Sequence, residues 1–272
     1  MDTRQQPNHQ YLKGMVEPHG PLLEIPSENQ LLYKVTTIEN FLASVTGQYL
    51  YFNRVDSYRD FPRADIHDGE QPPMDKPGNK ACKFEKHPGF SVADYYDRSR
   101  QRTYACSFSM DNSDHIWKTY GKYGKKGKVC LVYHFGKLRS YLNAIIQAQQ
   151  AILQSEGNTL TQIFSINYGK MNYVNWRKYQ TNLLQLPNPI VYTYLKDRRY
   201  TAENELRISL SALGIGRYAL NDGQEINLPP SLTIAFDFKR AFEQGIISVL
   251  CNQGDTFNFL RDDLKNFRID LT

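Results

Sequence analysis

The sequence predicts a single folded domain of the α+β class, for three reasons. Strand-like and helix-like stretches follow one another in a mixed order, without the regular alternation of a doubly wound sheet. The 272 residues are enough for one sizeable core. Apolar residues make up 40% and charged residues 22% of the chain, as in a folded globular protein. We therefore expect a single α+β domain over residues 29–272.

The first part of the chain divides into an arm and the start of the domain. Residues 1–28 hold four prolines and little apolar periodicity, so we expect a loosely ordered N-terminal arm. A first strand is expected at 30–35. Apolar residues at helical spacing predict a helix over 38–45, with Thr37 as its N-cap. Aromatic and β-branched residues predict a strand at 48–55.

The middle of the chain holds a long polar segment and then regular elements. Residues 56–90 contain five prolines, and so long a segment without periodicity is usually functional or disordered. The elements expected next are a strand at 103–109, a helix at 113–124 capped by Ser113, a buried strand at 128–135 and a long amphipathic helix over 137–157 that Gly157 ends.

The last third predicts further strands and one terminal helix. The expected elements are a strand at 163–169, a helical or mixed stretch at 172–186, a strand at 205–210, a hairpin turned by Asn221, Asp222 and Gly223, a strand at 231–238 and a helix at 257–267.

The sequence also predicts where the protein resides. No run approaches the roughly 18 apolar residues that span a bilayer, so no membrane partner is expected. The first residues contain no apolar core of a secretory signal. The four cysteines lie far apart, as in a cytoplasmic protein with reduced thiols. We expect a cytoplasmic protein.

Metal and thiol chemistry find little support in the sequence. The six histidines do not pair with one another, with cysteines or with carboxylates at ligand spacing, so no metal site is expected. A nucleophile made of Cys106 and His115 stays open. The competing interpretation of Cys106 as a small buried hydrophobic residue is the commoner case.

Two glycine-rich segments resemble nucleotide-binding loops. In residues 121–128, five residues separate Gly121 from Gly127 where the phosphate-binding loop needs four, and Val129 follows Lys128 where Ser or Thr is needed. The segment is either a helix cap with a solvated basic turn or a loop that binds phosphates or nucleic acid. Residues 214–219 match G-x-G-x-x-A, but a hairpin and prolines follow instead of a helix, so we reject a dinucleotide fingerprint there.

Two other segments carry candidate site residues. Trp117 and Tyr120 share a helix face, and this face either packs into the core or forms an aromatic wall beside Ser107. Glu203, Glu205 and Arg207 alternate, and as a strand they would share one face. That face is either a solvated sheet surface or a catalytic surface with two carboxylates.

Several short motifs in this order resemble a bacterial family described as a domain of unknown function. They are LYK at 32–34, YFNRVDSYRDFP at 51–62, CSFS at 106–109, W-x-x-Y at 117–120 and E-x-E-L-R at 203–207. Their order is similar to that of ADP-ribosyltransferases. The resemblance implies a mixed, mainly antiparallel split β core with flanking helices, NAD as the substrate and no metal.

The resemblance also implies roles for individual residues. Glu205 would be the catalytic carboxylate and Glu203 its partner on the acceptor side. A carboxylate on the ribose 2′-hydroxyl stabilises positive charge that develops on the sugar. The residues expected to bind NAD are Tyr33, Lys34, Ser107, Trp117, Tyr120 and Arg207.

The expected function is that of a toxin or phage-defence effector that modifies a macromolecule. A net charge of +5 and 19 tyrosines favour a nucleic-acid acceptor, RNA in particular, with Lys122, Lys125 and Lys126 as its contacts. An antitoxin protein would be a further partner. Two alternatives stay open: a non-catalytic module that binds nucleic acid or protein, and a nuclease that uses Asp56, Asp60 and Asp65 to hold a metal.

Overall fold

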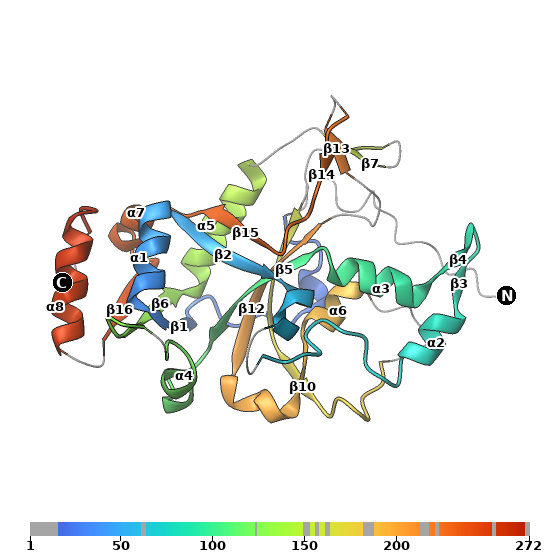
Figure 1. The fold of residues 1–272 in the computed structure, drawn as a ribbon, viewed down its shortest axis with the longest axis horizontal. Helices are drawn as coiled ribbons and strands as arrows, with labels where there is room; N and C mark the ends of the chain where they lie inside the picture. Colours follow the sequence, from blue (N-terminus) through green and yellow to red (C-terminus); the bar gives the residue numbers. More distant parts are fainter. Residues whose placement is uncertain are drawn as a thin grey trace.

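The protein has a mixed architecture in which a mainly antiparallel sheet is flanked by helices (Figure 1). This confirms the α+β prediction. Among the described strand pairs, only β10 with β11 is parallel. The computed structural model describes residues 16–60, 64–122, 124–148, 153–155, 158–160, 164–181, 188–212, 218–220, 223–251 and 254–269.

The central sheet has eight strands, and every pair in it is antiparallel. Its main path runs β15-β2-β5-β1-β6-β16, and β12 and then β9 lie on the other edge of β5. The strands are β1 (Leu31–Thr37), β2 (Tyr49–Arg54), β5 (Thr103–Ser109), β6 (Lys128–His134), β9 (Phe164–Lys170), β12 (Glu205–Ala212), β15 (Ser231–Ala235) and β16 (Ile247–Leu250).

The sheet is split along one edge of β5. On its other edge, β5 pairs with β12 over the whole length from Thr103 to Ser109. On the split edge, Ala105 pairs with Asn53 of β2, whereas Ser109 pairs with Tyr33 of β1. Strands β1 and β2 therefore leave β5 at different points, and the backbone between these points borders an opening.

Side-chain alternation gives the strands beside the split two different faces. Tyr104, Cys106 and Phe108 of β5 lie in the main hydrophobic core, together with Leu206 and Ile208 of β12. The side chains between them are polar and lie on the opposite face, as the two-residue period of a strand requires. They are Ser107, Ser109, Glu205, Arg207 and Ser209.

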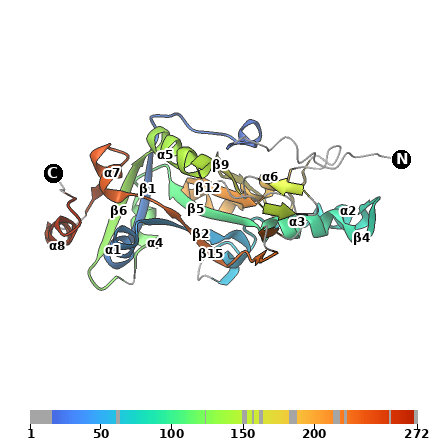
Figure 2. The ribbon, with the colours of Figure 1, turned by 90° about the horizontal axis from the view of Figure 1, so that it is seen from above.

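Helices from the start, the middle and the end of the chain contribute to the core of the sheet. In Figure 2, α5 and the segment of residues 16–28 lie along one side of the sheet. The Thr37 side chain accepts a hydrogen bond from Asn40 N, which confirms it as the N-cap of α1. The helices that contribute to this core are α1 (Ile38–Gly47), α5 (Phe135–Ala148), α7 (Phe238–Glu243) and α8 (Gly254–Lys265).

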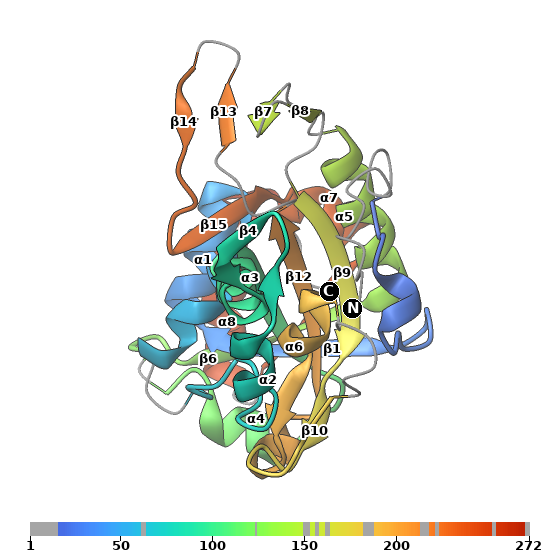
Figure 3. The same cartoon turned by 90° about the vertical axis from the view of Figure 1, so that its right-hand side faces the viewer.

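A second layer covers the polar face of β5 and β12. Figure 3 shows α2, α3 and α6 in front of β12. The layer has its own small apolar cluster, which includes Tyr96, Trp176 and Tyr192. Its elements are η3 (Val55–Asp60), α2 (Lys76–Ala81), β3 (Lys83–Phe84), β4 (His87–Ser91), α3 (Val92–Arg100), β10 (Asn172–Val174), α6 (Pro189–Thr193), β11 (Leu195–Asp197) and η4 (Arg198–Glu203).

Outside these layers lie a few short elements. Ser113 is the N-cap residue of α4 (Asp114–Thr119), although its side chain makes no capping hydrogen bond. The expected hairpin pairs β13 with β14, and its turn residues Asn221 and Asp222 lie outside the described residues. The remaining elements are η2 (Gly20–Leu22), β7 (Leu153–Ser155), β8 (Asn158–Leu160), β13 (Tyr218–Leu220) and β14 (Glu225–Ile226).

The expected N-terminal arm requires a correction for residues 16–28. Ile166 N donates to Val16 O at 3.0 Å and Lys170 N donates to Glu24 O at 2.8 Å, so this segment satisfies backbone groups at the outer edge of β9. Glu17 also forms an ion pair with Arg139 of α5 at 2.7 Å. Residues 16–28 are thus part of the domain, and residues 1–15 lie outside the described residues.

Further expectations differ from the structure. The helix expected at 113–124 ends at Thr119, and its C-cap Tyr120 is extended. The helix expected over 137–157 ends at Ala148, because Leu153–Ser155 pairs as strand β7 with both β8 and β13. Gly157, its expected last residue, lies outside the described residues, as does most of the segment 214–219. The segment 56–90 holds η3, α2, β3 and β4 and is part of the second layer. Its buried Asp65 accepts a hydrogen bond from Asp197 N, and Asp75 accepts hydrogen bonds from Thr181 and Tyr192, whereas Asp68 pairs with Arg207 of the central strand β12.

Candidate functional site

A cleft of about 700 Å³ lies at the split in the sheet. Strands β1, β2, β5, β11 and β12 contribute to its wall, together with α1 and η3. Of the residues predicted to form the site, those that line the cleft are Tyr33, Lys34, Ser107, Tyr120, Glu203, Glu205 and Arg207.

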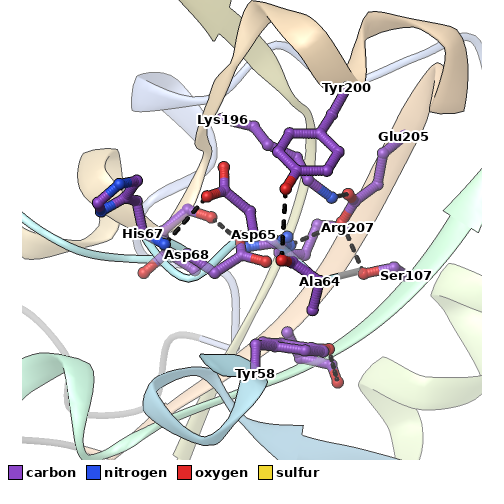
Figure 4. A network of polar contacts seen from close by, with 12 residues as sticks. Tyr58, Ala64, Asp65, His67, Asp68, Ser107, Lys196, Tyr200, Glu205 and Arg207 are labelled. Carbon is purple, nitrogen blue, oxygen red and sulfur yellow. Dashed lines mark hydrogen bonds and ion pairs between the residues drawn. The ribbon is translucent and has the colours of Figure 1, made fainter. Parts of the chain in front are cut away.

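The Glu205 carboxylate accepts hydrogen bonds from three side chains. Ser107 Oγ donates to its Oε1 at 2.6 Å, and Arg207 Nε donates to the same oxygen at 2.8 Å. Lys196 Nζ donates to its Oε2 at 2.7 Å. Glu205 is 3% exposed, so these short charge-assisted bonds hold it in one orientation (Figure 4).

Glu203 lies at the site, but it is not part of the expected strand. Strand β12 begins at Glu205, and Glu203 is the last residue of η4. Between them, Asn204 adopts the left-handed conformation with φ of 41°. The expectation that all three charged residues share one strand face is therefore wrong for Glu203. The turn still brings its carboxylate to 2.5 Å from Lys196 Nζ.

Arg207 connects Glu205 to Asp68 and to Thr193 of the second layer. Its Nη2 lies 2.8 Å from Asp68 Oδ1, an ion pair without hydrogen-bond geometry. Its Nη1 donates to Thr193 O at 2.8 Å. Arg207 is 1% exposed, and its guanidinium lies 5.8 Å from the centre of the Tyr58 ring. Arg207, which we expected to bind NAD, thus contacts the two carboxylates of Asp68 and Glu205.

The charged side chains form one continuous chain. Its order is Asp68, Arg207, Glu205, Lys196, Glu203, so that carboxylates and cations alternate. Each member borders the cleft. We call these five residues the charge chain.

Burial raises the pKa of all three carboxylates of the charge chain, but the neighbouring cations outweigh it only for Glu205. Burial alone would raise the pKa of Glu205, but Arg207 and Lys196 outweigh burial and hold this pKa well below its usual range. For Asp68, burial dominates over the attraction of Arg207 and raises the pKa. Burial also raises the pKa of Glu203 in spite of Lys196. Glu205 is therefore the carboxylate that stays ionised most firmly, and the two end members hold protons more readily.

The two cations of the charge chain remain protonated. Burial alone would lower the pKa of Lys196, but Glu205 and its neighbouring carboxylates raise it well above the ordinary value. The same balance between burial and the carboxylates Asp68 and Glu205 raises the pKa of Arg207. Both residues thus carry full positive charges inside the protein.

Lys34 lies apart from the charge chain, at the split itself. Its Nζ donates to Ser107 O at 2.9 Å and lies 5.1 Å from the centre of the Phe108 ring. The carbonyl of Ser107 belongs to the stretch of β5 between the pairings with β1 and β2. Lys34 thus satisfies a backbone acceptor where the sheet opens.

The two candidate aromatic residues, Trp117 of α4 and its C-cap Tyr120, lie in different environments. Trp117 is 8% exposed, packs with Val35 and Val132, and donates from Nε1 to Asn112 Oδ1 at 2.7 Å. It does not line the cleft, because it belongs to this small core cluster. Tyr120 does line it, with 41% of the residue exposed. Burial of its hydroxyl and the neighbouring Glu203 raise the pKa of Tyr120.

The lysines of the basic turn before β6 are all exposed but differ in their contacts. Lys122 and Lys125 are exposed. Lys126 is exposed too, but its backbone N donates to Glu39 and its Nζ lies 3.3 Å from Asp263. Gly121 at the start of the turn approaches Thr36, a residue of the cleft wall. The turn therefore adjoins the cleft without lining it.

The structure bears on the alternative chemistries as well. Among the described residues, no group of three or more His, Cys, Asp or Glu side chains could hold a metal ion. Asp56 pairs with Arg54 at 2.7 Å and Asp65 is 1% exposed, whereas the side chain of Asp60 lies outside the described residues. Cys106 is buried in the core face beside the cleft, and His115 lies exposed on α4.

Sequence reasoning missed two members of the charge chain. Lys196 follows residues 190–195 and is the first of four charged residues, 196–199, so nothing in the sequence distinguishes it from an exposed lysine. Asp68 carried no signal either, since it lies in the polar segment 56–90 and reaches Arg207 only through the fold.

None of the described helices is long and apolar enough to span a membrane. A scan against protein-family models and a search of curated proteins found no match to this chain.

Proposed function

We propose that the protein is an NAD-dependent ADP-ribosyltransferase-like enzyme, with Glu205 as the catalytic carboxylate. One observation carries this proposal. Glu205 is an ionised, fixed carboxylate in the wall of a cleft that opens through a split antiparallel sheet. Such a preorganised negative charge stabilises positive charge that develops on a sugar.

The proposed reaction breaks the bond between ribose and nicotinamide. The bond's electron pair leaves with nicotinamide, which becomes neutral, and the ribose acquires oxocarbenium character. An acceptor oxygen or nitrogen then forms the new bond to the sugar and releases a proton. Glu203 would take this proton, and the raised pKa of its carboxyl suits a general base.

The other cleft residues would hold the dinucleotide. Lys34 at the split suits a diphosphate, and the exposed Tyr120 ring suits stacking on a flat base. Tyr33 also borders the cleft. Ser107 and Arg207 would act mainly on Glu205, to which both donate. The packing of Trp117 in its own core cluster leaves it no part in binding.

We further propose that the acceptor is RNA and that the enzyme acts as a cytoplasmic toxin or defence effector, with an antitoxin protein as a partner. The exposed Lys122 and Lys125 beside the cleft and the net charge of +5 support a polyanionic acceptor.

A non-catalytic binding module is the second candidate. Glu205 already accepts from three side chains and is 3% exposed, as a carboxylate in a structural ion-pair network would be. In that case the cleft would bind its ligand without chemical change.

Glu205→Gln separates the two candidates. The purified protein is incubated with nicotinamide-labelled NAD in a cell extract, and released nicotinamide is measured. We expect the variant to lose activity by about a hundredfold or more. Glu243→Gln, on the exposed side of α7, serves as the matched control. A wild-type protein that is folded and binds NAD but releases no nicotinamide would establish the binding module instead.

A further inference from the structure

A second groove of the protein lies apart from the charge chain. It has a volume of about 780 Å³ and lies between α5, α7 and the residues before β16. Its longest wall is one face of α5 from Lys137 to Ala148, which spans about 16 Å at 1.5 Å per residue. Most residues of this wall are exposed. The groove is therefore long and open, a shape that fits a segment of another chain, whereas small molecules are commonly held in enclosing pockets.

The α5 wall consists of two rows of side chains, and the residues of each row are four positions apart. The rows are Lys137, Tyr141 and Ile145, with large side chains, and Ser140, Ala144 and Ala148, with small ones. Rows with this spacing are the ridges that interdigitate when two helices pack against each other. The small row leaves a shallow strip beside the large one, so a second helix can approach α5 closely.

The floor of the groove is apolar and is held in place by its own contacts. Ile246 is 3% exposed, and Ile145 is half-buried. The Tyr141 ring lies 5.0 Å from the ring of Phe236, and its hydroxyl accepts a hydrogen bond from Asp237 N at 3.0 Å. Because these contacts fix Tyr141, the apolar surface exists before a partner binds, which reduces the cost of ordering it.

Two cations flank this floor. Lys137 is exposed near the start of α5, and its Nζ donates to Gln244 O at 3.0 Å. Arg240 is exposed on α7. Both residues line the groove, so it presents positive charge on either side of its apolar part.

The carboxylates around the groove have partners of their own. Glu28, which also lines the groove, pairs with Arg139 at 2.6 Å. Glu243 pairs with Lys239 at 3.8 Å. Asp237 is the N-cap of α7 and accepts from a backbone N–H of that helix. The charges of Lys137 and Arg240 are thus available to carboxylates of a partner.

We propose that this groove binds an amphipathic helix of a protein partner, with acidic residues beside its apolar stripe. Aliphatic side chains of that helix pack on Tyr141, Ile145 and Ile246, and its carboxylates pair with Lys137 and Arg240. The inference goes beyond the proposed function and does not rest on it, since none of the described residues lines both the cleft and the groove.

The test uses two synthetic, fluorescently labelled helical peptides of about four turns, which match the length of the α5 wall. Both carry the same stripe of leucines. One peptide has glutamates beside the stripe, and the other has lysines at the same positions. Fluorescence anisotropy with the full-length protein measures their dissociation constants at physiological ionic strength. We expect the glutamate peptide to bind about tenfold more tightly than the lysine peptide.

Variants locate the binding. The double variant Lys137→Glu with Arg240→Glu should reverse the preference, so that the lysine peptide binds more tightly. Ala144→Arg adds a cation but fills the groove, and it should weaken binding of the glutamate peptide about tenfold. Ala144 is exposed and arginine is a good helix former, so α5 is retained, which circular dichroism checks. Lys118→Glu, on the exposed surface of α4, is the control and should change neither dissociation constant.

Three outcomes would overturn the inference. They are absence of binding by the glutamate peptide, equal binding of the two peptides, and undiminished binding of the glutamate peptide to Ala144→Arg, which would indicate attraction to a basic surface without a shaped site. Binding of labelled oligouridylate that Ala144→Arg abolishes would assign the groove to RNA and would also overturn the protein partner. These measurements use no NAD, so their failure is distinct from a failure of the proposed enzyme.

Discussion

The ammonium of Lys196 lies 2.7 Å from Glu205 Oε2 and 2.5 Å from Glu203 Oε2, so one buried cation holds two carboxylates together. Without it, two negative charges would face each other in a site where water screens them little. The two glutamates can therefore both be ionised in the cleft only while Lys196 is charged.

Lys196→Met should strongly destabilise the protein. Removing one partner of a buried ion-pair network leaves uncompensated charge, which costs about 3–5 kcal/mol. Urea denaturation measures the free energy of unfolding. Lys118→Met provides the control, because the Lys118 side chain is 78% exposed and should change stability by only about 0.5 kcal/mol. A loss of less than about 1 kcal/mol for Lys196→Met would contradict the role of this lysine.

Ser107→Ala should affect both stability and activity. The hydroxyl donates to the charged Glu205 at 2.6 Å, and such bonds contribute about 1.5–3 kcal/mol. Ser109→Ala, on the same strand as Ser107, is the matched variant. The Ser109 hydroxyl donates to the neutral backbone carbonyl of Asp111 at 2.9 Å. We expect nicotinamide release to fall further in Ser107→Ala. Equal effects of the two variants on release would show that Ser107 does not orient the carboxylate.

The stability of the protein should depend on pH through Glu203. The folded-state pKa of Glu203 is raised above the ordinary 4.5, so the folded protein holds this proton more tightly than the unfolded chain does. The contribution of Glu203 to the free energy of unfolding is thus greatest below pH 4.5 and declines as pH rises through the folded-state pKa. Relative to Glu203→Gln, the wild-type protein should lose stability over this interval.

Glu205 provides the opposite slope in the same experiment. Its folded-state pKa lies below the ordinary 4.5, so its stabilising contribution is present above pH 4.5 and is lost as pH falls through the folded-state value. Denaturation of wild type, Glu203→Gln and Glu205→Gln at several pH values measures both slopes. Slopes of the same sign would show that the two carboxylates do not differ as the structure indicates.

Alanine at Lys122 and Lys125 should weaken RNA binding without unfolding the protein. Both side chains are exposed, so stability should change by only about 0.5 kcal/mol. Each phosphate contact that is lost should reduce the slope of log affinity against log salt by about 0.7. The control is the double variant Lys83→Ala with Lys86→Ala. Both lysines are exposed in or beside the β3–β4 hairpin, which lies far from α4 and the turn that follows it in Figure 1. Equal losses in both pairs would indicate nonspecific attraction to a basic surface.

Local patterns were sufficient for most strands and for one face of the site. The apolar and polar residues of β5 and β12 alternate and lie on opposite faces, and Glu205 and Arg207 share one face as predicted. The pattern over-predicted α5, because Leu153 continues its apolar periodicity, whereas residues 153–155 pair as β7 with two other strands. Pairing between distant segments overrides a local preference.

The sequence by itself determined that Glu205 and Arg207 share a strand face, since they lie two residues apart on one strand. The pairing of β12 with β5, which places Ser107 beside them, belongs to the tertiary structure. Only the tertiary structure decided which groups meet there. Lys196 of β11 and Asp68 of the segment 56–90 contact Glu205 and Arg207, respectively. Glu203 lies beside Lys196 because of the left-handed turn at Asn204, and Trp117 packs away from the cleft. These contacts join residues whose separation along the chain carries no periodic signal, and the folded packing alone brings them together.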